Sequence, residues 1–294
     1  MNGQNGVRTR AKLLLIVVLV VGGAALAGGA LFQLTGPRPD PVSPASAPAG
    51  AVPSPASAPA GAVPSPASAP AGAVPSPASA PAGAVPLTDL RALISSPGAL
   101  TISVLGDSTG DEPGEWVDLW ARDLAARGTV TLHFWDAAAG DWEAHPTVYP
   151  GPDRSITVWN GSRAGASYAY PLEHLHRIQP SRPSLTVLNF GHNPYPDRAD
   201  EGAAELLAAS DAKWAAPVPA AIVLQNPSLG MWQEQTAGSV AALRGWAPGA
   251  GYPVIDVNEA FRARGGLPGL LADDVHPNPA GQRLWADTVR AALG

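Results

Sequence analysis

Hydrophobic and polar residues follow three different patterns along this chain of 294 residues. Residues 13–34 form one apolar run, residues 35–86 form a repeat rich in Pro, Ala and Ser, and residues 87–294 carry short apolar runs separated by amphipathic segments. Only the last pattern supplies large apolar side chains at the spacings that a packed core needs. Its length also suits one domain with a sizeable core. We therefore expect a single folded domain over residues 87–294.

The apolar runs of this domain have the length and the β-branched content of buried strands. They are Leu100–Leu105, Val130–Trp135, Ile156–Trp159, Leu185–Phe190, Ala221–Gln225 and Pro253–Val257. Helical patterns lie between and after them, at Glu115–Ala126, Pro171–Ile178, Ala199–Lys213, Met231–Trp246 and Ala280–Leu293. Apolar strands that alternate with helices predict a three-layer α/β/α sandwich with a central parallel sheet. In such sheets, functional residues are expected at the carboxyl ends of the strands.

The apolar run at residues 13–34 follows a basic segment, residues 1–12, with three positive charges. As a helix it would be roughly 33 Å long, enough to cross a bilayer core of about 30 Å. The positive charges would stay in the cytoplasm and leave the rest of the chain outside. The alternative is a signal peptide that is cleaved near Ala27, after a small-x-small sequence. Both interpretations place the domain outside the cytoplasmic membrane, either anchored by a single span or secreted.

The repeat that follows is almost perfect, because VPSPASAPAGA occurs at residues 52–62, 63–73 and 74–84. Three prolines in each copy exclude a helix. Small side chains bury too little area to offset the entropy of ordering, so residues 35–86 are expected to be a disordered linker, extended and partly polyproline II. The linker is either a stalk that holds the domain away from the membrane or a tolerated repeat expansion.

Charge and cysteine content exclude several kinds of partner and site. The formal net charge is −6, and removing the three positive charges before the apolar run leaves −9 for the remainder. The domain contains a single lysine, Lys213, so it lacks the basic surface that nucleic-acid binding requires, and we expect no nucleic-acid partner. There are no cysteines, which excludes disulfides and cysteine-ligated zinc.

Two polar segments at predicted strand ends have the residues of nucleophilic catalysis. Gly106-Asp107-Ser108 follows the first strand, and Asp273 lies three residues before His276, just ahead of the last helix. A serine hydroxyl needs an imidazole to accept its proton, and the imidazole needs a carboxylate to fix its tautomer. Each segment alone is common in loops, as a turn or as a helix cap.

Two further segments supply hydrogen-bond donors at other strand ends. They are Asn160–Ser167 and Gly191-His192-Asn193. Glycine allows close approach of a backbone N–H group, and an asparagine amide is a good donor. Together with the N–H of Ser108, these groups could form an oxyanion hole. Gln225-Asn226-Pro227 reaches the same edge, where it either contacts substrate or forms a turn.

In this order, the four segments resemble the SGNH hydrolases, also called the GDSL esterase/lipase superfamily. The matching residues are Gly106-Asp107-Ser108, the glycine of Asn160–Ser167, Gly191-x-Asn193 and Asp273-x-x-His276-Pro277. The resemblance covers roughly residues 99–294 and implies a flavodoxin-like α/β/α fold. It also implies Ser108 as the nucleophile, His276 as the base, Asp273 as its orienting acid, and Ser108, Gly165 and Asn193 as the oxyanion donors.

The resemblance has departures. Family members often read Asn-x-x-x-x-Gly-x-Thr in the second block, which favours Gly165 over Gly161 as the donor. Pro194 stands where a second acid often follows the third block, and Thr109 replaces the leucine of Gly-Asp-Ser-Leu. His192 lies within the third block and is a candidate for lining the pocket.

The expected function is that of an extracytoplasmic serine hydrolase that cleaves carboxylic esters and requires neither a metal nor an organic cofactor. Its expected partners are a small-molecule, glycan or lipid ester and, if residues 13–34 are not cleaved, the membrane. An acyltransferase or a glycan deacetylase with the same triad is an alternative. A binding module on a hydrolase fold that has lost its activity is another.

Overall fold

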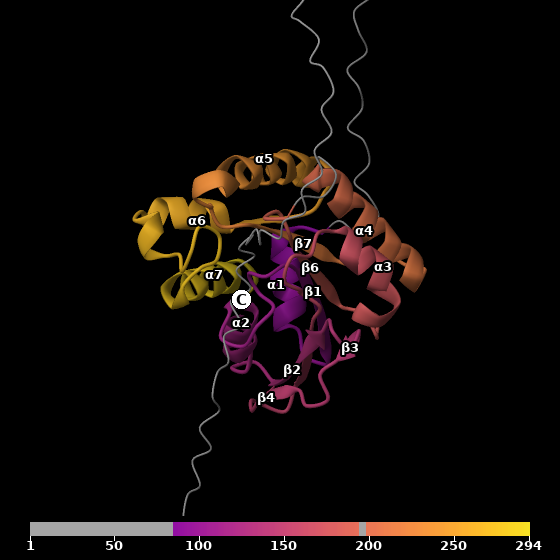
Figure 1. The fold of residues 1–294 in the computed structure, drawn as a ribbon. Helices are drawn as coiled ribbons and strands as arrows, with labels where there is room; N and C mark the ends of the chain where they lie inside the picture. Colours follow the sequence, from indigo (N-terminus) through magenta and orange to yellow (C-terminus); the bar gives the residue numbers. More distant parts are fainter. Residues whose placement is uncertain (1–84, 194–197) are drawn as a thin grey trace, which may run out of the picture. The chain divides into compact units, whose positions relative to one another are not determined.

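The computed structural model describes residues 85–193 and 198–294 (Figure 1). The predicted anchor or signal segment and all but the last two residues of the predicted linker lie outside the described residues. Within the described ranges, no helix has both the length and the apolar content needed to cross a membrane.

An eight-stranded sheet forms the centre of the domain, in the order β3-β2-β5-β1-β6-β7-β8, with β4 paired to β2. The strands are β1 (Leu100–Gly106), β2 (Thr129–Asp136), β3 (Asp141–Trp142), β4 (Thr147–Tyr149), β5 (Ser155–Asn160), β6 (Leu185–Asn189), β7 (Ala220–Leu224) and β8 (Val254–Asp256). The six predicted strands are present and parallel to one another. The sheet is nevertheless mixed, because β3 and β4 run antiparallel to β2. The prediction of a parallel sheet was wrong at this edge, since these two short strands lie among charged residues, glycine and proline and not in an apolar run.

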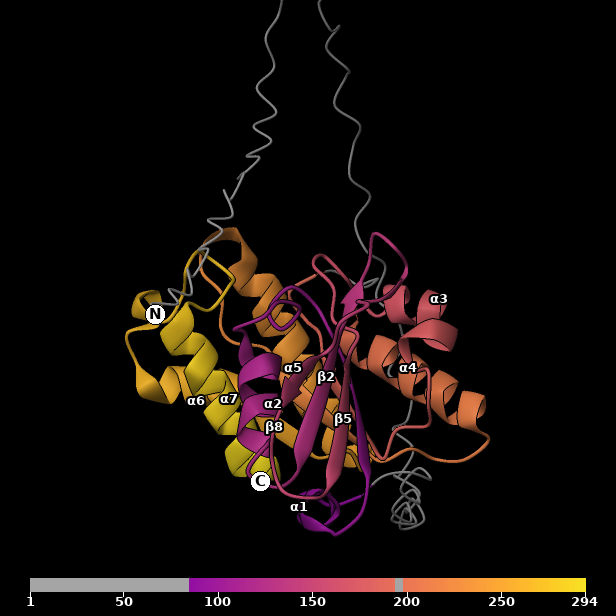
Figure 2. The same cartoon turned by 90° about the horizontal axis from the view of Figure 1, so that it is seen from below.

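Helices cover both faces of the sheet, which confirms the α/β/α layers. Figure 1 and the turned view of Figure 2 place α2, α6 and α7 on one side of the strands and α3, α4 and α5 on the other. The helices of the first side are α1 (Leu87–Ser95), α2 (Trp116–Leu124), α6 (Val257–Arg264) and α7 (Pro279–Leu293); those of the second are α3 (Ala169–Ile178), α4 (Ala199–Trp214) and α5 (Gln233–Gly249). Helices α1 and α6 were not predicted.

The alternation of side chains along β1 divides the core into two layers. Ile102 and Val104 pack among the residues of α2 and α7, whereas Leu105 packs on the side of α3 and α4. In the first layer, the indole rings of Trp116 and Trp285 stack with centroids 5.8 Å apart. This fully buried pair joins α2 to α7, the two helices that flank the loops carrying Ser108 and His276.

Strands β5, β1, β6, β7 and β8 have the flavodoxin-like order 2-1-3-4-5 when they are numbered along the chain, and β2 extends this sheet at its edge. The direction of winding reverses between β1 and β6. A crevice opens at the carboxyl ends of strands where such a reversal occurs. The segment with Ser108 follows β1, and the segment with Asn193 follows β6, so the topology brings both to this crevice.

Candidate active site

Ser108, His276 and Asp273 form a continuous chain of hydrogen bonds. Ser108 Oγ lies 2.8 Å from His276 Nε2, although the two residues are 168 positions apart. On the other side of the ring, His276 Nδ1 lies 2.8 Å from Asp273 Oδ2. The fold therefore brings together the three side chains that the sequence selected.

The loop that carries Asp273 and His276 is held by hydrogen bonds within the loop and by the segment after β7, from which Asn226 Nδ2 donates to the carbonyl of Val275 (2.9 Å) and the N–H of Leu229 donates to the carbonyl of Asp274 (2.7 Å). Asp273 Oδ1 accepts hydrogen bonds from the N–H groups of Val275 (2.8 Å) and His276 (2.7 Å). Leu271 pairs with Pro277 across the base of the loop. Partial burial raises the pKa of Asp273. The two backbone N–H groups and the His276 ring together lower this pKa by a larger amount, so it lies below the usual value. The carboxylate therefore stays ionised through the neutral range.

The turn that carries Ser108 is held by buried side chains. Asp107 is fully buried, and its Oδ1 accepts hydrogen bonds from the Thr109 N–H (3.2 Å) and hydroxyl (2.9 Å). Its Oδ2 accepts a hydrogen bond from Gln225 Nε2 at 2.9 Å. The N–H of Gly110 donates to the carbonyl of Asp107 and closes the turn. Asp107 therefore points away from solvent and fixes the backbone on both sides of Ser108.

Two more side chains extend this support. Gln282 of α7 donates to the carbonyl of Thr109 (3.2 Å) and accepts from the N–H of Trp116 (2.8 Å), which ties the turn to the start of α2. Asn160, at the end of β5, donates to the carbonyl of Gly110 at 2.7 Å. Gln282 stands in no motif that indicates this role, and Gln225, expected either to contact substrate or to form a turn, supports the turn from within the core.

The two glycines that competed for the second block have different environments. Gly161 is buried, its N–H donates to the carbonyl of Val104, and an added Cβ would lie 2.4 Å from Ile178 Cγ2. Gly161 thus serves packing, and its N–H is occupied. Gly165 is exposed, with φ at +72°, in a tight turn that favours glycine.

Asn193 joins the third block to the second. Its Nδ2 donates to the carbonyl of Ala166 at 3.0 Å, while the N–H of Arg163 donates to the carbonyl of Gly106 at 3.1 Å. These bonds hold the loop with Gly165 beside the end of β1. His192 is buried, and its two ring nitrogens have no hydrogen-bond partner among the described residues; burial lowers its pKa and favours the neutral ring.

A cavity of about 420 Å³ opens over the serine and the histidine. Its walls are Ser108, His192, Asn193, Trp232 and the loop 273–276. Gly165 is not among the described residues that line this cavity. The exposed ring of Trp232 was not assigned to the site from the sequence. No cluster of histidine and acidic side chains in residues 85–193 and 198–294 has the arrangement of a metal site.

Comparison with known proteins gives a family match and several similar folds. The sequence model of the family described as GDSL-like Lipase/Acylhydrolase matches residues 102–289. No curated protein matches the chain. Among solved structures, LAE5, an alpha/beta hydrolase enzyme from the metagenome of Lake Arreo in Spain, is 16% identical with a TM-score of 0.52, over 68% of this chain and 98% of its own. The lipase/acylhydrolase from Enterococcus faecalis is 17% identical with a TM-score of 0.47, over 65% of this chain and 93% of its own. At 16% identity the likeness to LAE5 is one of fold.

Proposed function

Because the chain belongs to the GDSL-like lipase and acylhydrolase family, we propose that Ser108, His276 and Asp273 are the catalytic triad with which it hydrolyses carboxylic esters. Membership of this family makes the protein a carboxylic ester hydrolase. The observation that supports the triad is the hydrogen-bonded chain from Ser108 Oγ through the His276 ring to Asp273. Nucleophile, base and orienting acid stand in the order that acyl transfer requires.

In the acylation step, Ser108 Oγ attacks the ester carbonyl carbon while its proton passes to His276 Nε2. Asp273 holds the proton on Nδ1 and stabilises the imidazolium that forms. The tetrahedral intermediate then collapses, the carbon–oxygen bond to the leaving alcohol breaks, and His276 returns its proton to the alcohol oxygen. The acyl group remains on Ser108 as an ester.

The negative charge on the tetrahedral oxygen needs preorganised donors. We assign this role to the N–H groups of Ser108 and Gly165 and to the side-chain amide of Asn193. An amide has two N–H groups, and only one of those of Asn193 is needed for its bond to Ala166. That bond fixes the orientation of the amide before substrate arrives, which is what makes an oxyanion donor effective.

Deacylation repeats these steps with water as the nucleophile. His276 accepts a proton from water as the water oxygen attacks the acyl carbon, and Ser108 leaves with the proton that His276 returns. The chain and water supply every proton and nucleophile in the cycle. We therefore propose a hydrolase that needs no added cofactor.

We also propose that the domain works outside the cytoplasmic membrane. The support is the uncharged run at 13–34 after the basic residues 1–12, followed by the repeat at 35–86 and the domain at 87–294. Protease treatment of spheroplasts that express the full chain should remove the domain. A domain that is cleaved only after lysis would contradict the proposal.

The triad is tested by covalent labelling. A fluorophosphonate probe should label the wild-type chain at Ser108, and Ser108→Ala should abolish labelling and lower kcat for p-nitrophenyl acetate by about 10⁶-fold. Ser155→Ala is the matched control, because Ser155 is exposed at the amino end of β5. Labelling of the Ser108→Ala variant, or hydrolysis at the wild-type rate, would rule out Ser108 as the nucleophile.

A further inference from the structure

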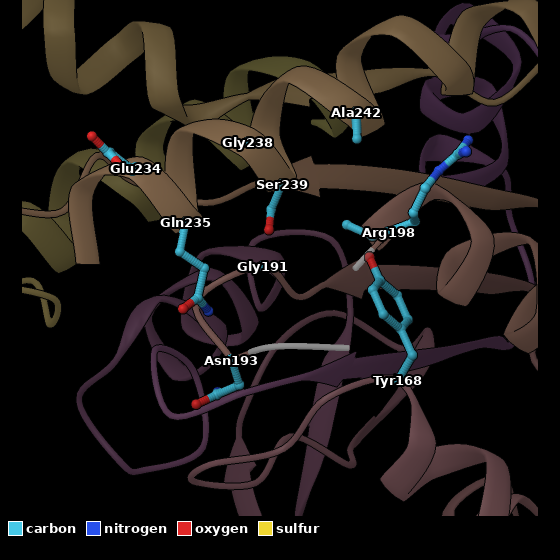
Figure 3. Close-up of a pocket in the computed structure, with 10 residues that line it drawn as sticks. Tyr168, Gly191, Asn193, Arg198, Glu234, Gln235, Gly238, Ser239 and Ala242 are labelled. Atoms are coloured by element: carbon cyan, nitrogen blue, oxygen red, sulfur yellow. The ribbon is translucent and has the colours of Figure 1, made fainter. Parts of the chain in front are cut away.

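A second cavity, with a volume of about 400 Å³, lies beside the one that contains Ser108. Asn193 is part of both walls, so the two cavities adjoin at this residue. Helix α5 forms one side of the second cavity, and Gly191, Asn193 and Arg198 lie on the opposite side (Figure 3). The volume falls within the roughly 300–1,000 Å³ that is typical of small-molecule sites.

One face of α5 lines the cavity, and three of its five lining residues are small. Glu234, Gln235, Gly238, Ser239 and Ala242 line it, and their spacing places them on a single helix face. The large apolar residues of α5 lie on its buried face instead. An added Cβ at Gly238 would meet nothing within 4 Å. A larger side chain at this position would therefore project into empty space.

Contacts between α5 and the loop after β6 fix the shape of the cavity. Gln235 Nε2 donates to the carbonyl of His192 at 2.6 Å. Gly191 has φ at +149°, and an added Cβ there would lie 3.2 Å from Gln225 Cγ and 3.3 Å from Ser239 Cβ. Figure 3 shows Gln235 and Ser239 pointing from α5 toward Asn193 and Gly191. The helix and the oxyanion loop are thus attached to each other at the boundary between the cavities.

The charges of the cavity favour a neutral ligand with hydroxyl groups. Arg198 is the only cation among its described walls, and Asp200 (2.9 Å) and Glu201 (3.5 Å) already compensate its charge. Glu234 has no ion-pair partner in the described part of the chain, so its carboxylate accepts hydrogen bonds from hydroxyl groups and repels phosphates and carboxylates. The apolar part of the described lining comes from Tyr168, Ala199 and Ala242, and it includes no large aliphatic side chain that would pack along an alkyl chain.

We propose that this second cavity binds the hydroxyl-bearing alcohol part of the ester, so that the substrate is a short acyl ester of a sugar or a similar polyol. This inference rests on the proposed function, because it takes Ser108 as the site of reaction. Glu234, Gln235 and Ser239 are the polar groups that contact the alcohol. Gly238 provides the room for it.

The experiment compares two esters of the same acid in variants of the full chain. The first ester is p-nitrophenyl acetate, whose alcohol part has no hydroxyl groups, and the second is a mono-O-acetylated methyl glucoside that keeps its other hydroxyls. Gly238→Leu fills the cavity. Gly245→Leu is the matched control, since Gly245 lies on the same helix, is exposed, does not line the cavity and has nothing within 4 Å of an added Cβ.

We expect Gly238→Leu to lower the ratio of kcat/KM for the sugar ester to kcat/KM for p-nitrophenyl acetate at least tenfold, mainly through KM. Glu234→Gln should lower this ratio about threefold, and Gly245→Leu should leave it unchanged. Thermal unfolding of each variant shows whether its fold is intact.

Three outcomes would overturn the inference. An unchanged ratio in Gly238→Leu would show that the sugar does not enter the cavity. A preference of the wild type for long-chain p-nitrophenyl esters, lost in Gly238→Leu, would assign the cavity to the acyl chain. Binding of lysophospholipid that Glu234→Gln strengthens would assign it to a lipid. If Ser108→Ala retains activity toward p-nitrophenyl acetate, the proposed function itself fails, and this result is separate from the ratio.

Discussion

The turn with Ser108 and the loop with His276 meet at one hydrogen bond, but they are held in place in different ways. In the turn, Asp107 and Thr109 are fully buried, and their partners include Gln225, which is 118 residues from Asp107. In the loop, the Asp273 side chain is 57% exposed, and its hydrogen-bond partners, Val275 and His276, lie in the same loop. The position of Ser108 therefore depends on buried side chains of the core, whereas the orientation of the His276 ring depends on an exposed carboxylate three residues away. The same substitution should have opposite consequences in the two regions.

Of the substitutions that test this comparison, Asp273→Asn should have the largest effect, a loss of activity with almost no change in stability. The remaining carbonyl oxygen can still accept the N–H groups of Val275 and His276, so the loop should keep its shape. The new amide would donate to His276 Nδ1 and place the ring proton on Nε2, where it prevents acceptance of the Ser108 proton. We expect kcat to fall by about 10⁴-fold. Steady-state kinetics with p-nitrophenyl acetate and thermal unfolding measure the two effects.

A fall in the unfolding temperature of Asp273→Asn by more than a few degrees would contradict the comparison. It would mean that the exposed loop contributes to global stability. Asp274→Asn is the matched control, because Asp274 is the exposed neighbour in the same loop, whereas the described hydrogen bonds of the His276 ring go to Ser108 and Asp273.

Asp107→Asn makes the same change in the buried turn, and we expect it to lower the stability of the fold. An amide group at this position would direct its N–H groups at one of two existing donors, Gln225 Nε2 or the Thr109 N–H. A buried donor left without an acceptor costs about 1–3 kcal/mol. We expect the free energy of unfolding to fall by that amount, as measured by the midpoint of urea denaturation. A variant of unchanged stability would show that the turn is not part of the cooperative core.

The sequence predicted the parts of the fold that have a periodic pattern. The six parallel strands and five helices were predicted because each lies in a run or a period of apolar residues. The prediction joined the end of β8 to the start of α6, since the predicted strand Pro253–Val257 is interrupted only by Asp256 and the helix starts directly after it. Asp256 is in fact the cap of α6 and accepts from the Glu259 N–H. Strands β3 and β4 lie among charged residues, glycine and proline, so no apolar run indicates them.

The site was predictable to the extent that its residues lie in short motifs. Ser108, Asp273 and His276 each stand in a recognisable segment, and the segment order suggested that they meet. The residues that hold the serine in place were not predictable in the same way. Gln225 and Gln282 support the turn from 118 and 173 residues away, and a single glutamine has no local pattern that indicates a distant partner. Long-range polar contacts of this kind become visible only in the fold.

The pKa shifts of two carboxyl groups, Glu115 and Asp273, also distinguish the two regions. Glu115 lies at the end of the segment that follows Ser108, just before α2, and burial raises its pKa to about 8. The N–H of Glu112 lowers this pKa, and the charges of Asp111 and Glu112 add to the increase. The pKa of Asp273 shifts in the opposite direction, below its usual value. A raised pKa means that the folded chain binds a proton that the unfolded chain has released.

The smallest predicted effect is a change in thermal stability that depends on pH. Between the ordinary glutamate pKa of 4.5 and about 8, the folded state binds more protons at Glu115 than the unfolded state, so stability falls as pH rises through this window. Glu115→Gln removes the charge and keeps an oxygen that can accept the Glu112 N–H. We expect the variant to unfold at the same temperature as the wild type at pH 4.5 and about 2–4 °C higher at pH 8.5. This corresponds to a free energy of about 1 kcal/mol, which is small because Glu115 is partly open to solvent.

The loop with Asp273 contributes no change in stability in this pH window, since a lowered pKa affects stability only at more acid pH. Thermal unfolding across the pH range measures the difference, with Glu143→Gln as the matched control because Glu143 is exposed and does not contribute to the pKa shift of Glu115. An equal gain at pH 4.5 and 8.5 would show that the charge of Glu115 is not its cause.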